Sequence, residues 1–127
     1  MYMKIFAAAL AGFTTVAMAA DPINLFTYKN ETAVAYTDTF NKTGTRYSMM
    51  FGYKTSTTER REFLSVDSTT CERKYGSLYS RQSEHVSWKY LDNVIPVVRS
   101  EMTHGDHMAF IICVTALSYN VINNTKN

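Results

Sequence analysis

Residues 23–79 have the side-chain pattern of β-strands, in which apolar and polar residues alternate with a period of two. The stretch is rich in Thr, Tyr, Phe and Val, which suit a pleated and half-buried surface. Residues 46–53 (RYSMMFGY) predict a strand with a buried middle, and residues 62–67 predict a third strand. Turns are expected at residues 41–44, where Gly44 is free to take a positive φ, and at the polar residues 55–61. A further break is expected at Gly76 and Ser77.

After residue 83 the apolar spacing changes from two to three and four, as on one face of a helix. The stripe consists of Trp88, Leu91, Ile95, Val98 and Met102. Ser83 is a suitable N-cap, Glu84 complements the helix dipole, and Gly105 provides a C-terminal stop. Pro96 removes a backbone donor within this helix, so we expect a kink or a break near Asn93.

A short and almost wholly apolar run follows at residues 108–117 (MAFIICVTAL). Its length and its branched residues predict a central strand that is covered on both faces. The tail after Ile122 is polar and is expected to fray. The patterns together predict a β-rich α+β domain of about five strands, with one helix between the third and fourth strands.

Residues 1–19 have the three parts of a secretory signal peptide: a positive start at Lys4, an apolar run and an Ala17-Met18-Ala19 cleavage site. The run is too short to span a membrane, and no stop-transfer segment follows it. Cleavage there leaves residues 20–127, enough for one small domain. We therefore expect a secreted or periplasmic protein without a transmembrane span.

Two cysteines, Cys71 and Cys113, lie in the exported part of the chain. An even number of cysteines in an oxidising compartment predicts one intramolecular disulfide. The chain also contains three glycosylation sequons, at Asn30, Asn41 and Asn123. Whether they are used depends on whether the source is eukaryotic or bacterial, which the residues leave open.

Charge and motif content argue against several classes of function. Cleavage of the predicted signal peptide removes Lys4 and lowers the formal net charge from +2 to +1. A protein that is nearly neutral has no electrostatic reason to bind nucleic acid or an anionic membrane. Residues 104–107 (HGDH) have some metal-ligand character, but their spacing across a glycine favours a solvated turn over a zinc site. The chain has no phosphate loop and no nucleophile motif, so we expect no metal, no cofactor and no catalytic activity.

The tyrosine-rich segment after Cys71 is the predicted ligand-binding region. Tyrosine beside arginine and glutamine combines a flat apolar face with hydrogen-bonding groups, as in sugar or protein recognition. The candidate residues are Tyr75, Tyr79, Arg81, Gln82 and His85. The alternative is that these tyrosines pack on the surface of a sheet with wet hydroxyls.

The predicted order of elements resembles the small OB-fold barrel of bacterial AB-toxin B subunits. Residues 36–39 (YTDT), with Gly44 and Arg46, are similar to a hairpin of the cholera and heat-labile enterotoxin B chains. Residues 84–88 (EHVSW) and 28–30 (YKN) resemble stretches of pertussis-type B subunits. The resemblance implies a secreted pentamer that binds cell-surface glycans and delivers a catalytic A chain. It also places residues 81–85 where that family has a sugar-binding loop.

Two features depart from the toxin pattern. Cys71 precedes the predicted helix, whereas the first cysteine of the cholera type lies near the mature N-terminus. Residues 114–116 (VTA) stand where that family has a sugar-stacking tryptophan, so ganglioside binding cannot be carried over. The sequence thus favours a non-catalytic glycan- or receptor-binding subunit. A periplasmic inhibitor or immunity protein, which occludes a partner enzyme or toxin and so has an envelope protein as its partner, is the alternative.

Overall fold

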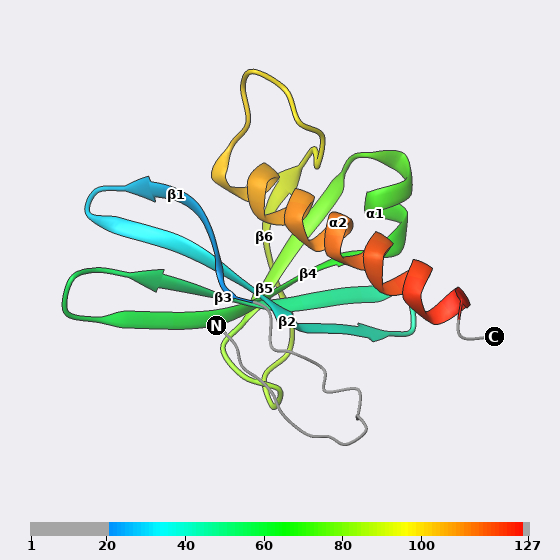
Figure 1. The fold of residues 1–127 in the computed structure, drawn as a ribbon, viewed down its shortest axis with the longest axis horizontal. Helices are drawn as coiled ribbons and strands as arrows, with labels where there is room; N and C mark the ends of the chain where they lie inside the picture. Colours follow the sequence, from blue (N-terminus) through cyan, green and yellow to red (C-terminus); the bar gives the residue numbers. More distant parts are fainter. Residues whose placement is uncertain (1–20, 126–127) are drawn as a thin grey trace.

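The computed structural model describes residues 21–125, so the predicted signal peptide lies outside the described residues. The architecture is α+β and rich in β-structure, as predicted, with one curled antiparallel sheet and one long helix (Figure 1). The strands are β1 (Ile23–Tyr28), β2 (Glu31–Thr43), β3 (Arg46–Lys54), β4 (Glu59–Asp67), β5 (Gly76–Arg81) and β6 (Lys89–Val94). The helices are α1 (Ser68–Arg73) and α2 (His104–Thr125).

Each strand pairs antiparallel with the next strand in the sequence, which gives the order β1-β2-β3-β4-β5-β6. The β1–β2 hairpin turns through Lys29 and Asn30, whose φ angles of 50° and 67° suit a type I′ turn. Gly44 has the positive φ predicted for it, 62°, in the turn between β2 and β3. The turn is shorter than predicted, because residues 41–43 are the end of β2. The strands predicted at residues 46–53 and 62–67 are likewise confirmed as β3 and β4.

The two faces of the sheet carry different side chains, because neighbouring residues of a strand point to opposite sides. Along β3, the residues at odd positions from Tyr47 to Tyr53 belong to the buried core, which faces α2. Arg46 and Ser48 alternate with them and lie on the opposite side, which we call the outer face. The register pairs Ser48 with Ser65 of β4, and Ser65 with Tyr79 of β5, so the outer face continues across these strands.

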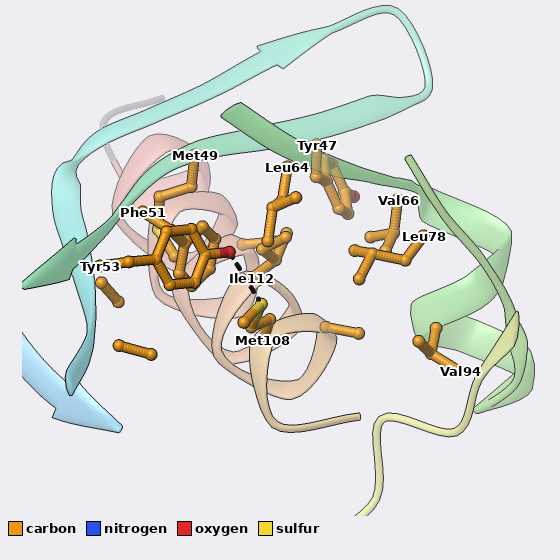
Figure 2. Packing of buried hydrophobic residues seen from close by; sticks show 14 residues of the cluster. Tyr47, Met49, Phe51, Tyr53, Leu64, Val66, Leu78, Val94, Met108 and Ile112 are labelled. Carbon is orange, nitrogen blue, oxygen red and sulfur yellow. Dashed lines mark hydrogen bonds between the residues drawn. The ribbon is translucent and has the colours of Figure 1, made fainter. Parts of the chain in front are cut away.

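The core lies between the inner face of the sheet and α2 (Figure 2). Met49, Phe51 and Leu64 are fully buried on the strands and meet Ile112 of the helix. Tyr53 reaches across this space, since its hydroxyl donates to the sulfur of Met108 at 3.6 Å and also to Glu62. Burial raises the pKa of Tyr53, and the hydrogen bond to Glu62 adds to that shift.

The predicted disulfide between Cys71 and Cys113 is confirmed and joins α1 to α2, with the two Cα atoms 5.5 Å apart. The two cysteines are 42 residues apart in the sequence. Closing a loop of that length stabilises a fold by on the order of 4 kcal/mol in the chain-entropy model. Helix α1 is capped by Asp67, whose carboxylate accepts from the Thr69 amide. Its Thr70 packs so closely on Gly76 that a Cβ added at Gly76 would lie 2.1 Å from the Thr70 hydroxyl.

The helix predicted from the apolar stripe between residues 88 and 102 is wrong. Residues 89–94 form the edge strand β6 and pair with β5, which runs through the break expected at Gly76 and Ser77. Leu91, Ile95 and Val98 are exposed rather than buried on one side, so their helical spacing does not reflect a packed face. Pro96 stands just after β6, where its missing N–H interrupts no helix.

The strand predicted at residues 108–117 is also wrong, because the run is the middle of α2. Met108, Ala109, Ile112 and Ala116 are the buried face of this helix, at helical spacing. Thr103 and Asp106 start the helix with a reciprocal capping pair: the Asp106 amide donates to the Thr103 hydroxyl, and the Thr103 amide donates to the Asp106 carboxylate. The helix continues to Thr125, past the point where the tail was expected to fray.

These corrections change the predicted topology. The long helix follows the last strand instead of separating the third and fourth strands. The six strands are neighbours in sequence order, whereas an OB-fold is a five-stranded Greek-key barrel. The OB-like arrangement is therefore replaced by a curled meander with α2 across its inner face.

Candidate functional site

The structure brings together only part of the predicted ligand-binding set. Tyr79 and Arg81 lie on the outer face of β5, two residues apart. Gln82 and His85 are exposed in the loop that leads from β5 to Trp88. Tyr75 is separated from them, because it precedes the other end of β5, about 20 Å from Arg81 at 3.3 Å per residue. There it lines a pocket with Ile95 and Arg99.

Trp88 is the centre of the cluster on this part of the outer face. The guanidinium carbon of Arg81 lies 4.2 Å from the centroid of its ring, and that of Arg46 lies 5.3 Å away. Arg46 also lies over the ring of Tyr79, at 4.9 Å. Both distances to Trp88 are within the range in which a cation is attracted to an aromatic face. Two positive charges therefore share one indole.

A small cleft of about 200 Å³ opens at these residues. It is lined by Asn41, Thr43, Arg46, Ser48, Arg81 and Trp88, and we call it the Trp88 cleft. One wall comes from the β2–β3 hairpin, and the other comes from the end of β5 and the segment before β6. Asn41, which belongs to one of the three sequons, donates to the Thr43 hydroxyl at 2.9 Å on the first wall.

The positive charge in the Trp88 cleft has no carboxylate partner within the described part of the chain. Arg46 donates to the neutral Ser65 hydroxyl at 2.7 Å, and Arg81 approaches the backbone oxygen of Glu84 at 3.5 Å. Asp67 is paired with Arg46 in the strand register, but its carboxylate is engaged by Thr69 and Thr45. The Nε atom of Arg81 is buried and has no hydrogen-bond partner among residues 21–125. An unsatisfied buried donor costs about 1–3 kcal/mol.

Two tyrosines extend the aromatic surface from the cleft toward the edge of the sheet. The rings of Tyr79 and Tyr90 meet edge to face, with 6.4 Å between their centroids. Tyr90 is 57% exposed, so its ring is open to a ligand. Because Tyr79 touches Arg46, the charged cleft and the exposed ring of Tyr90 form one continuous surface.

A third arginine on the same outer face, Arg61, differs in having its charge balanced. Arg61 lies over the ring of Tyr36 at 4.6 Å, and its Nε donates to Glu59 at 3.0 Å. The Tyr36 hydroxyl donates to the same carboxylate. The hydrogen bond from Tyr36, followed by that from Arg61, lowers the pKa of Glu59. Gly52 makes this approach possible, since a Cβ there would lie 2.5 Å from the Glu59 oxygen. We call these residues the Tyr36 cluster.

The segment with metal-ligand character has a structural role. His104 stacks on Phe26 with ring centroids 4.1 Å apart, and it meets Tyr28 edge to face. Asp106 is buried, caps α2 and binds the Arg99 guanidinium. Within residues 21–125, no group of three metal-binding side chains is positioned to hold an ion.

Sequence reasoning missed Arg46, Trp88 and Tyr90. The sequence pattern places Arg46 only in a strand and its hairpin, and it places Trp88 on the apolar face of a helix. The alternation of side chains along a strand could have identified Arg46. It alternates with the apolar residues of β3 and therefore lies on the outer face.

Comparison of the chain with family models, with curated proteins and with solved structures gives no match.

Proposed function

We propose that the protein is an exported, non-catalytic binding module, and that the Trp88 cleft binds a saccharide bearing a carboxylate or sulfate group. The observation that carries this proposal is the pair of guanidinium groups around one indole without a counter-charge among the described residues. Arginine is suited to such a ligand, because its planar donors match the geometry of an oxyanion and form charge-assisted hydrogen bonds.

The aromatic surface beside the cleft supports a sugar as the carrier of that anionic group. The exposed ring of Tyr90 offers a flat apolar face, and Tyr79 connects it to the cleft. The lining of the cleft itself supplies the hydroxyl and amide groups of Ser48, Thr43 and Asn41. A volume of about 200 Å³ lies below the range typical of drug-sized ligands, so the cleft suits one anionic group and part of one sugar ring.

The lining of the cleft supports binding rather than catalysis. It contains no carboxylate and no imidazole that would serve as a general base. The disulfide between Cys71 and Cys113 indicates an oxidising, extracytoplasmic environment, where an exported module would meet glycans.

The function is tested on a glycan array that pairs each acidic saccharide with its neutral counterpart. Glucuronate-terminated and sulfated members should be bound, and glucose-terminated and unsulfated members should not. The variant Arg46→Gln/Arg81→Gln should lose at least 100-fold in affinity, since it removes two charge-assisted hydrogen bonds that contribute about 1.5–3 kcal/mol each. Arg61→Gln is the matched control, because it removes a stacked arginine whose charge is already balanced.

An arm with inorganic sulfate alone distinguishes a saccharide site from a simple anion site. Saccharide binding at least tenfold tighter than sulfate binding supports the proposal. Equal binding of acidic and neutral members, or an unchanged affinity in the double variant, contradicts it.

The alternative function, occlusion of a partner enzyme, requires an exposed surface suited to another protein. Helix α2 provides an exposed apolar surface on the other side of the molecule. The uncharged stripe of this helix favours a second copy of the chain over an enzyme.

A further inference from the structure

The side of α2 that faces away from the sheet carries a regular apolar stripe. Phe110, Val114, Leu117 and Val121 follow one another at spacings of four, three and four, the pattern of a coiled-coil seam. Leu117 is 66% exposed and Val121 is 54% exposed, whereas Ile112 on the opposite side is fully buried. The helix thus has two apolar faces, and only one of them is packed against the sheet.

A groove runs beside this stripe. It has a volume of about 630 Å³ and lies between α2, α1 and the loop after β6. Pro96, Val97 and Val98 form one apolar wall, Leu117 stands on the other, and the disulfide lines it as well. Val98 is 67% exposed at the rim. An apolar ridge and an apolar groove therefore lie side by side on one surface.

Charged side chains line the groove only on its α1 side, at Glu72 and Lys74, and the α2 side carries none. Residues 107–123 contain no Lys, Arg, Asp or Glu. The positions that flank the stripe include Ser118 and Asn120, which are polar and uncharged. Two copies of this helix can meet without like-charge repulsion.

We propose that the stripe on α2 is the interface with a second copy of this chain. In two-stranded coiled coils, a β-branched residue at the a position and leucine at the d position are the preferred combination. Val114 and Val121 occupy a positions here, and Leu117 occupies the d position between them. In a twofold pair the stripe of each copy packs against the stripe of the other, with the walls of the groove at its margin, so one surface satisfies both sides.

The expected interface between the two copies is small, so their affinity for each other should be modest. A helix of 22 residues is about 33 Å long and about 10 Å wide, so together with the adjoining loop it buries on the order of 500 Å² from each copy. The total of about 1,000 Å² is near the lower limit for a specific interface. We expect a reversible dimer with a dissociation constant in the micromolar range, rather than an obligate one.

Sedimentation equilibrium of the purified native protein, from about 1 μM to 1 mM, tests this proposal. The mass should rise from one copy to two across that range. Leu117→Glu should weaken the dimer at least 100-fold, because it places a charge in the centre of the seam. Leu91→Glu is the matched control, since Leu91 is also exposed but lies on β6, and this variant should dimerise as the wild type does. Circular dichroism of both variants checks that they are folded.

Several outcomes would overturn the two-copy interface. They are a monomer at 1 mM, a ring of five copies, or a Leu117→Glu variant that dimerises normally. A membrane is the other candidate occupant, since His104–Asn123 has the length and hydropathy of a membrane span and only 28% of it is buried. A protein that stays monomeric and sediments with phosphatidylcholine vesicles would favour the membrane and contradict the dimer.

Discussion

Two arginine–aromatic clusters share the outer face of the sheet, and they differ in their counter-charge. In the Tyr36 cluster, Arg61 lies over Tyr36 and is bound by Glu59. In the Trp88 cleft, Arg46 and Arg81 approach Trp88 and no carboxylate is within ion-pair distance among the described residues. The aromatic contacts have similar distances, so the aromatic ring by itself does not distinguish the two.

The comparison suggests that the two clusters serve different purposes. A balanced pair at the surface contributes little beyond local order. An unbalanced pair of guanidinium groups carries a repulsion that a bound anion would relieve, and the free Nε of Arg81 adds an unsatisfied donor. We therefore expect ligand binding at the Trp88 cleft and a structural role for the Tyr36 cluster.

The largest effect is expected at another balanced arginine–carboxylate pair, whose carboxylate is buried. Asp106 accepts from Ile95 and Thr103 and binds Arg99 at the start of α2. Asp106→Ala should lower the free energy of unfolding by about 3–5 kcal/mol, because it leaves Arg99 and two amides without their acceptor. Urea denaturation measures this loss. A change below 1 kcal/mol would show that burial does not strengthen a balanced pair.

Asp106 should also make the stability of the protein depend on pH. Burial by itself raises the pKa of Asp106, but the hydrogen bonds from Ile95, Thr103 and Arg99 outweigh it and lower the pKa below its usual value. A carboxyl whose pKa is depressed by folding stabilises the protein above about pH 4 and loses this contribution as the pH falls further. Asp106→Asn should remove that part of the acid sensitivity. An unchanged slope of stability against pH below 4 would contradict the assignment.

An intermediate effect is expected when the missing counter-charge is supplied. Ser48 lines the Trp88 cleft beside both arginines, so Ser48→Glu should give this cluster the balance that Glu59 gives the other. Affinity for an acidic saccharide should fall about tenfold or more, which corresponds to about 1.4 kcal/mol. Isothermal titration calorimetry measures the change. Ser48→Gln, which has similar size without charge, should retain more of the affinity, and equal losses in both variants would point to blockage of the cleft.

The smallest effect is expected from the reverse exchange, Glu59→Gln. The site is at the surface, so the melting temperature should change by no more than about 3 °C. Because Tyr36 and Arg61 depress the pKa of Glu59, any stability that it supplies is present near neutral pH and lost on acidification, and the variant should lack this loss. Thermal unfolding at pH 7 and pH 3 provides the test. A large destabilisation at pH 7 would mean that the Tyr36 cluster supports the fold more than its exposure implies.

Strands β3 and β4 could be predicted because each buries apolar residues of one face in the core. In β3 the buried residues Tyr47, Met49 and Phe51 stand at every second position. This spacing predicts a strand and also shows which of its faces points into the core. Helix α2 could not be predicted in the same way, because its apolar residues surround it. Val114 and Leu117 are exposed on the side opposite Ile112, which gave the run the appearance of a strand buried on both faces.

The candidate site was found only in part, for a reason of topology. Tyr79 and Arg81 are close in sequence and share one strand face, so a local pattern identifies both. Arg46 and Trp88 come from β3 and from the segment before β6, and only the strand register brings them to the same place. Tyr75 was included because it is near in sequence, although it lies at the far end of β5.

The most direct test follows the indole N–H signal of Trp88, the only tryptophan of the chain, by nuclear magnetic resonance. Titration with glucuronate should shift this signal in a saturable manner, and 0.5 M salt should weaken the effect because the contact is electrostatic. Titration with glucose should leave the signal in place. Equal shifts with both sugars, or none with glucuronate, would contradict an anion-binding role for the unbalanced arginine pair.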